Sequence, residues 1–186
     1  METPGAVVEE FSKVVMESTA IHGIFLYGLR RQVVEMNSTP VHPTNPDPML
    51  YVSDGNPNLP STKIQGGWRK SVFLEKAHRD GEFETMLSQQ WIVLVFSLWE
   101  TEYRTRLASA HHCDRNLLQY SILGDLRQLR HDILHNRGLA SKEHTGKCEI
   151  MSDWFELGQT ISLTSDQIAT IINEIPFTLM QTHPTP

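Results

Sequence analysis

Arg130, His131 and His135 are the residues whose types and spacing best suit a chemical reaction. An imidazole can accept or donate a proton near neutral pH, because its pKa lies close to 6.5. A guanidinium stays charged and offers paired donors to a phosphate. Cleavage of RNA by its own 2′-hydroxyl needs a base, an acid and a cation. By residue type alone, Arg130 could hold a phosphate, His135 could act as general acid or base, and His131 could orient or contact a substrate, and this chemistry requires no metal or other cofactor.

One predicted amphipathic helix, from about Asp114 to Ala140, positions these side chains. Apolar residues fall within a band of roughly 80° on its wheel and predict a face directed to the core: Leu118, Ile122, Leu126, Leu129 and Ile133. Gly138 follows where a glycine commonly ends a helix. Arg127, Asn136 and, from the preceding helix, Glu100 are further candidates for positioning the substrate.

A second face of the same helix carries Arg127, Arg130, His131 and His135 together with the apolar Tyr120, Leu123 and Leu134. This mixture favours contact with another subunit, although a solvated face with scattered hydrophobic residues is the alternative. On a single ideal helix Arg130 and His135 point roughly 140° apart, which makes a poor site. Two copies related by a two-fold axis would bring both pairs around one phosphate, so we expect a homodimer through the helix of residues 115–138.

The composition predicts one domain over residues 1–186, with 39% hydrophobic and 20% charged residues. A net charge of −6 argues against a dedicated duplex-DNA binder but leaves room for a local basic site. No run is long enough to span a membrane, and the first residues lack a secretory signal. Two cysteines cannot make a disulfide framework, so a cytoplasmic location is expected.

The remaining pattern predicts an all-α bundle. Helical periodicity extends over about residues 3–36, 68–77 and 82–110, and a capping box at Thr164–Gln167 opens a last helix ended by Pro176. Residues 37–67 contain six of the ten prolines and predict a long irregular loop, in which Met49–Val52 is a candidate short strand. A short extended segment with a turn at Gly158 precedes the last helix, and residues 176–186 are expected to form a frayed tail.

The arrangement Arg130-His131 followed by His135 resembles the signature Arg-polar-x(3–5)-His of the HEPN superfamily, small α-helical domains many of which are ribonucleases. Other arginine–histidine pairs have a looser match in spacing, but only Arg130 is followed by a favoured polar residue on a helix with a complete core stripe. His131 stands where the family often has Asn. The layout of about residues 70–175 also looks like HEPN proteins of prokaryotic toxin and defence systems.

This resemblance implies a HEPN-like bundle that cuts RNA at a composite site in a dimer interface, in a toxin or defence system. It also implies a cognate antitoxin or an associated defence protein as a further partner. A HEPN-like module that binds RNA or protein without catalysis is the alternative reading.

A zinc-stabilised interaction protein is a third reading. His131 and His135 have the i,i+4 spacing by which one helix face holds a metal, and His144 with Cys148 repeats that spacing. These four residues could bind Zn²⁺, although the second pair lies in a polar stretch with no clear helix. A nucleotide-binding ATPase is disfavoured, because Gly66-Gly67 lacks the context of a phosphate-binding loop.

Overall fold

The computed structural model describes residues 2–40 and 42–182, and the chain is 61% helix and 8% strand. The expected predominance of helix is confirmed. The fold divides into two units, Met1–Ile24 with Thr85–Pro186 and Phe25–Glu84. We call them the helical unit and the hairpin unit. The prediction of a single domain stays a prediction. Within the described residues, no helix has the length and apolar character that crossing a membrane requires.

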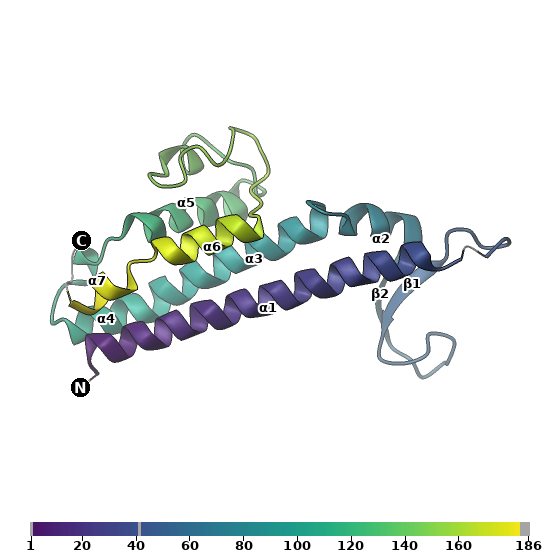
Figure 1. Cartoon of the computed structure of the whole chain (residues 1–186), viewed down its shortest axis with the longest axis horizontal. Coiled ribbons are helices and arrows are strands. Elements are labelled where there is room, and N and C mark those ends of the chain that lie inside the picture. Colours follow the sequence, from purple (N-terminus) through teal and green to yellow (C-terminus); the bar gives the residue numbers. More distant parts are fainter. Residues whose placement is uncertain (1, 41, 183–186) are drawn as a thin grey trace. The chain divides into compact units, whose positions relative to one another are not determined.

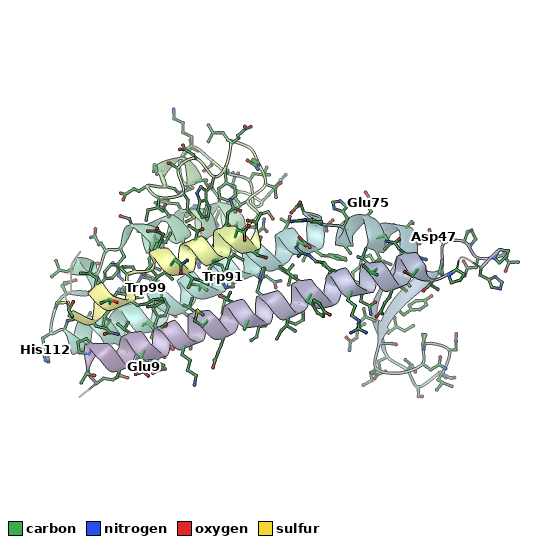
Figure 2. The ribbon with its side chains drawn as sticks, viewed as in Figure 1. Glu9, Asp47, Glu75, Trp91, Trp99 and His112 are labelled. Atoms are coloured by element: carbon green, nitrogen blue, oxygen red, sulfur yellow. The ribbon has the colours of Figure 1, made fainter. Side chains whose placement is uncertain are left out.

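The helical unit holds the candidate site and most of the buried core. Its elements are the part of α1 (Pro4–Ser38) up to Ile24, α3 (Glu82–Leu98) from Thr85 onward, α4 (Arg104–Ala110), α5 (Ser121–His135), α6 (Ser165–Glu174) and α7 (Phe177–Thr182). The first part of α1 runs alongside α3 (Figure 1), and the Trp91 indole donates to the Thr19 hydroxyl over 3.1 Å. Trp91 and Trp99, both labelled in Figure 2, are almost fully buried. This packing anchors the helix that leads into the site.

A π-helical turn at Trp99–Tyr103 joins α3 to α4. Residues 82–110 are therefore helical throughout, as expected, but they include one wider turn. The Phe11 ring of α1 packs against the rings of Trp99 at 5.5 Å and Tyr103 at 5.0 Å, which holds the turn against the core. Such turns often occur at functional sites, because they redirect neighbouring side chains. Glu100, one of the site residues predicted from the sequence, belongs to this turn.

The core stripe of the organising helix is confirmed, but the helix begins later than expected. α5 starts at Ser121, and Asp114 instead caps a 3₁₀ turn at Arg115–Leu117 by accepting from the Asn116 amide over 2.7 Å. The first four stripe residues are buried and the last is half-buried: Leu118, Ile122, Leu126, Leu129 and Ile133.

The predicted apolar second face of this helix is largely wrong. Tyr120 and Leu123 lie in the core, and the Tyr120 ring meets the Trp99 ring edge-on at 5.8 Å. Both belong to the buried core cluster that includes Trp99 of the π turn, and Tyr120 precedes α5 in extended backbone, outside the helix for which the wheel was drawn. Leu134 alone of the three is exposed, at 48%. The face that remains open is therefore more polar than the sequence suggests.

The end of the chain follows the sequence prediction up to Pro176. Gly138 has a φ of 72° after α5, and Gly158 has a φ of 82° at the predicted turn. An isolated bridge pairs Leu139 with Thr160, and the expected capping box at Thr164 opens α6. The predicted frayed tail is wrong for residues 177–182, which form α7, because Met180 is fully buried there. Residues 183–186 lie outside the described part.

The hairpin unit corrects the prediction of an irregular loop over residues 37–67. β1 (Met49–Ser53) pairs antiparallel with β2 (Ile64–Arg69), and α2 (Lys70–Ala77) follows. The candidate strand at Met49–Val52 is thus real, and its partner begins where glycines suggested a loop. A Cβ on Gly67 would lie 2.8 Å from the Leu50 carbonyl oxygen, so only glycine fits this close strand pair. The helix expected from Trp68 starts two residues later, because Trp68 belongs to β2.

An ion pair in the hairpin unit makes a first prediction. Arg30 donates from Nε and Nη2 to the two oxygens of the Glu84 carboxylate, at 2.9 and 3.2 Å. Burial acts to raise the pKa of Glu84, but the bonds from Arg30 and from the Asp80 amide hold that pKa below 4.5. The ionised Glu84 carboxylate therefore stabilises the folded chain at pH values above the pKa that Glu84 has in the unfolded chain. This contribution is lost as the pH falls through the pKa that Glu84 has in the folded chain.

We expect the free energy of unfolding to fall less steeply below about pH 5 in Glu84→Gln than in the wild type. Denaturant titrations across the acid range, monitored by circular dichroism, measure the slope. Glu75→Gln is the matched control, because Glu75 is exposed in the same unit. Identical acid slopes for Glu84→Gln and the wild type would contradict the assignment.

Candidate functional site

A groove of about 890 Å³ opens in the helical unit between the π turn, the segment before α5 and α5 itself. Four of the residues predicted from the sequence line it: Glu100, Arg127, Arg130 and His131. The groove also contains Arg104 from α4 and Lys147 from the segment after α5. Side chains from distant parts of the sequence therefore meet here, as a binding site requires.

Three cations of this groove have no carboxylate partner within the part of the chain that the structure describes: Arg127, Arg130 and Lys147. Glu100, in contrast, accepts from Arg104 over 2.9 Å and also pairs with Arg115. No ion pair joins Glu100 to Arg130 among the described residues. Five Arg and Lys side chains and three carboxylates line the groove, so the groove is locally basic on a chain whose net charge is −6.

Arg130 is held in a defined position by packing. Its guanidinium carbon lies 5.9 Å from the centroid of the Phe96 ring, and its side chain is half-buried. The Nε atom is buried without a hydrogen-bond partner in the described residues. A guanidinium placed over an aromatic face keeps its charge and its donors for another ligand. Phosphate oxygens are acceptors of the kind that such donors bind best.

His135 and Asn136 do not line the groove. The His135 ring is exposed and its centroid lies 4.6 Å from that of His131, so the two imidazoles are neighbours at one side of α5. Asn136 donates from its side-chain nitrogen to the Leu139 carbonyl over 2.6 Å. This bond closes the end of the helix and gives Asn136 a structural role, and its predicted contact with a substrate stays a prediction.

Two buried aspartates of α5 hold the segment after the helix in place, and sequence reasoning missed both. Asp132 is fully buried and accepts from the amides and hydroxyls of Ser141 and Thr145 at 2.7–3.1 Å. Asp125 accepts from three successive amides, those of Glu149, Ile150 and Met151, each at 2.8 Å.

Both aspartates fall at the edge of the apolar stripe on the helical wheel. A carboxylate at such a position must find donors when the stripe is buried, and this signal was present in the sequence. Burial acts to raise the pKa of Asp132, but the four hydrogen bonds hold it below 3.8. Asp132 is therefore a charged acceptor at neutral pH that fixes the segment carrying His144.

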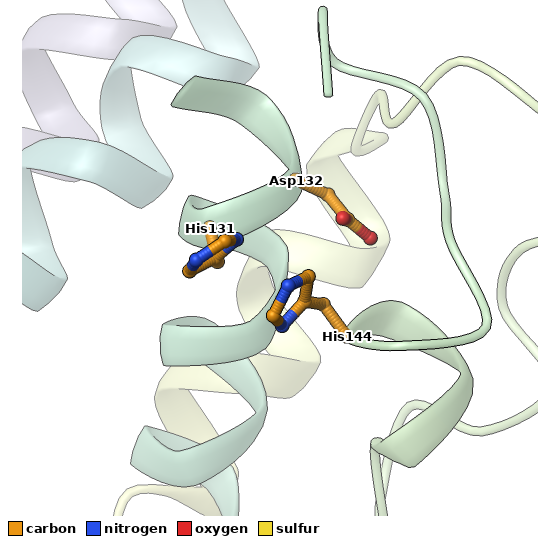
Figure 3. Close-up of side chains that lie close together, drawn as sticks. All are labelled: His131, Asp132 and His144. Carbon is orange, nitrogen blue, oxygen red and sulfur yellow. The ribbon is translucent and has the colours of Figure 1, made fainter. Parts of the chain in front are cut away.

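His144 comes from this segment and lies directly against His131. Their ring centroids are 3.6 Å apart with an angle of 26° between the planes, and Figure 3 shows the two rings side by side. Loss of solvation and the neighbouring rings of His144 and His135 lower the pKa of His131 below 6.5. Three imidazoles thus gather at the edge of the groove, although only His131 lines it.

The four-residue zinc set considered from the sequence does not assemble. Cys148 is buried, its sulfur lies 3.9 Å from the Asp125 carbonyl oxygen, and burial raises the pKa of its thiol to about 12. In the described residues, the group whose ligand atoms lie within 4.8 Å of one another is His131, Asp132 and His144. The i,i+4 relation of His144 to Cys148 has no helical basis, because these residues flank a short 3₁₀ turn.

Comparison with known proteins adds no identification: no family model, curated protein or solved structure matches the chain. The residues of the groove and the resemblance of Arg130, His131 and His135 to the HEPN signature are therefore the grounds for a functional proposal.

Proposed function

We propose that this chain is a metal-independent endoribonuclease of the HEPN type, in which Arg130 binds the scissile phosphate, His135 acts as general acid or base, and His131 orients or contacts the substrate. The observation that carries the proposal is the local charge of the groove. Arg127, Arg130 and Lys147 lie together without carboxylate partners among the described residues, beside an imidazole. A polyanion is the ligand class that such a groove attracts, despite the negative charge of the whole chain.

The chemistry divides between the cation and the imidazoles. A neutral imidazole takes the proton of the 2′-hydroxyl, whose oxygen attacks the phosphorus, and a protonated imidazole gives a proton to the departing 5′-oxygen. Arg130 stabilises the additional negative charge that develops on the phosphate oxygens. The products are a 2′,3′-cyclic phosphate and a free 5′-hydroxyl. No redox step or cofactor is needed for this balance.

A second copy of the chain completes the proposed site. The attacking and departing oxygens lie on opposite sides of the phosphorus, whereas His131 and His135 are neighbours at one side of α5 in a single chain. A two-fold axis near the end of α5 supplies an imidazole from the other side. Leu134, which is exposed next to His135, offers apolar contact for this interface. We accordingly keep the homodimer through residues 115–138 as part of the proposal.

Incubation of the purified chain with structured RNA in excess EDTA tests the function. We expect cleavage products with cyclic phosphate ends, and a loss of about 10²–10⁴-fold in rate for His135→Ala, the range for removal of a general acid or base. His112→Asn is the matched control, since His112 is exposed, does not line the groove and has a φ of 54° that Asn tolerates.

Two other outcomes would replace the proposal. Binding of RNA that weakens with salt, without cleavage, would indicate the non-catalytic module. Absence of both binding and cleavage in a folded, dimeric preparation would remove RNA as the ligand. Sedimentation in parallel with the assay establishes whether the active species is a dimer.

A further inference from the structure

We propose that His131, His135 and His144 form a binding site for one divalent transition-metal ion, with Zn²⁺ as the expected occupant. Two of the residues lie one turn apart on α5, and the third comes from the segment after the helix. The His131 ring centroid is 4.6 Å from that of His135 and 3.6 Å from that of His144. Three imidazoles with a water molecule make a four-coordinate site of the kind that zinc adopts in proteins.

The third histidine is held in place by groups that leave one ring nitrogen free. The His144 Nδ1 atom lies 3.3 Å from the Gln128 side-chain oxygen, which is an acceptor. With the hydrogen on Nδ1, this contact is a hydrogen bond and Nε2 keeps a lone pair for a metal. A partner of this kind on the second nitrogen is the usual way in which proteins orient a histidine ligand.

Asp132 belongs to the group of ligand atoms within 4.8 Å of one another, but we assign it the role of an anchor and not of a ligand. Both of its oxygens are engaged by Ser141 and Thr145, the residues on either side of the His144 segment. Figure 3 shows the Asp132 carboxylate turned toward that segment, while the two imidazoles lie together. The available donors are thus nitrogen atoms alone, which favours zinc, nickel or copper over magnesium or calcium.

The His135 imidazole lies outside the group of ligand atoms within 4.8 Å of one another, so coordination requires side chains to rotate. The rings of His131 and His144 are stacked with 26° between their planes, so their nitrogen atoms must turn to converge on one ion. His131 and His135 are exposed, and nothing in the core has to move for this rotation. One consequence rests on the proposed function: bound zinc would withdraw His131 from the groove and inhibit cleavage of RNA.

Isothermal titration of the metal-free, full chain with zinc chloride alone tests the site. We expect one equivalent per chain, with affinity at least 100-fold weaker in His144→Ala and unchanged in the control His112→Asn. Cys148→Ala should also bind one equivalent, which separates the three-histidine site from the four-residue set. Substitution with Co²⁺ gives a second measurement, because a tetrahedral nitrogen site produces visible absorption that His144→Gln should lose.

Circular dichroism of each variant confirms that it folds. Absence of stoichiometric zinc binding by the wild type, or equal affinity of His144→Ala and wild type, would overturn the proposal. The titration contains no RNA, so its failure leaves the proposed nuclease untouched. Equally, a chain that binds zinc but does not cut RNA in EDTA would keep the metal site and lose the nuclease.

Discussion

Arg130→Ala is expected to reduce RNA cleavage in EDTA by at least about 100-fold, because the groove loses the cation that faces the developing charge on the phosphate. The Arg130 side chain is positioned by the Phe96 ring and forms no ion pair with a described carboxylate. Its removal therefore breaks no ion pair, and its buried Nε leaves no partner behind. We expect the midpoint of thermal unfolding to change by only a few degrees while the activity disappears.

Arg130→Lys separates the two properties of the guanidinium. Lysine keeps the positive charge but cannot offer a planar pair of donors or the same contact with the Phe96 ring. Its activity should lie between those of the wild type and Arg130→Ala. Arg31→Ala is the control, because it removes one positive charge at an exposed position in the hairpin unit. Full activity in Arg130→Ala would exclude Arg130 from the reaction.

The sequence was sufficient where a residue depends on its near neighbours. The stripe on α5, the capping box at Thr164 and the turn at Gly158 all follow from local spacing or from local backbone needs, and the structure contains each of them. The proximity of the His131 and His135 rings also follows from helical geometry, because residues four apart lie on one face of a helix. These features involve residues a few positions apart, for which the chain geometry is fixed by the helix or the turn.

Features that depend on distant packing could not be predicted in this way. The β2 strand contains Gly66 and Gly67, and only its pairing with β1 makes it a strand. A helical wheel shows which residues share a face but not what covers that face. It therefore places Tyr120 and Leu123 at an interface, whereas both are buried in the core. Similarly, the distance between His131 and His144 depends on how the chain returns to α5 after Gly138.

That return depends on buried charge, and it leads to the largest expected effect on stability. Asp132→Ala should lower the free energy of unfolding by about 3–5 kcal/mol. Four hydrogen-bond donors lose their charged acceptor, and the buried donors among them cannot bind water in its place. Asp132 is fully buried, and its partners are the amides and hydroxyls of Ser141 and Thr145. Denaturant unfolding followed by circular dichroism measures the change.

Asp132→Asn should lose less than Asp132→Ala, because the amide oxygen still accepts while the amide nitrogen faces donors. Asp153→Ala, at an exposed position in the same unit, should stay within about 0.5 kcal/mol of the wild type. A variant of Asp132 that remains folded should also bind zinc more weakly, since His144 is no longer held beside His131. If Asp132→Ala lost less than about 1 kcal/mol, the segment would be held by packing alone, and the anchor would have to be sought elsewhere.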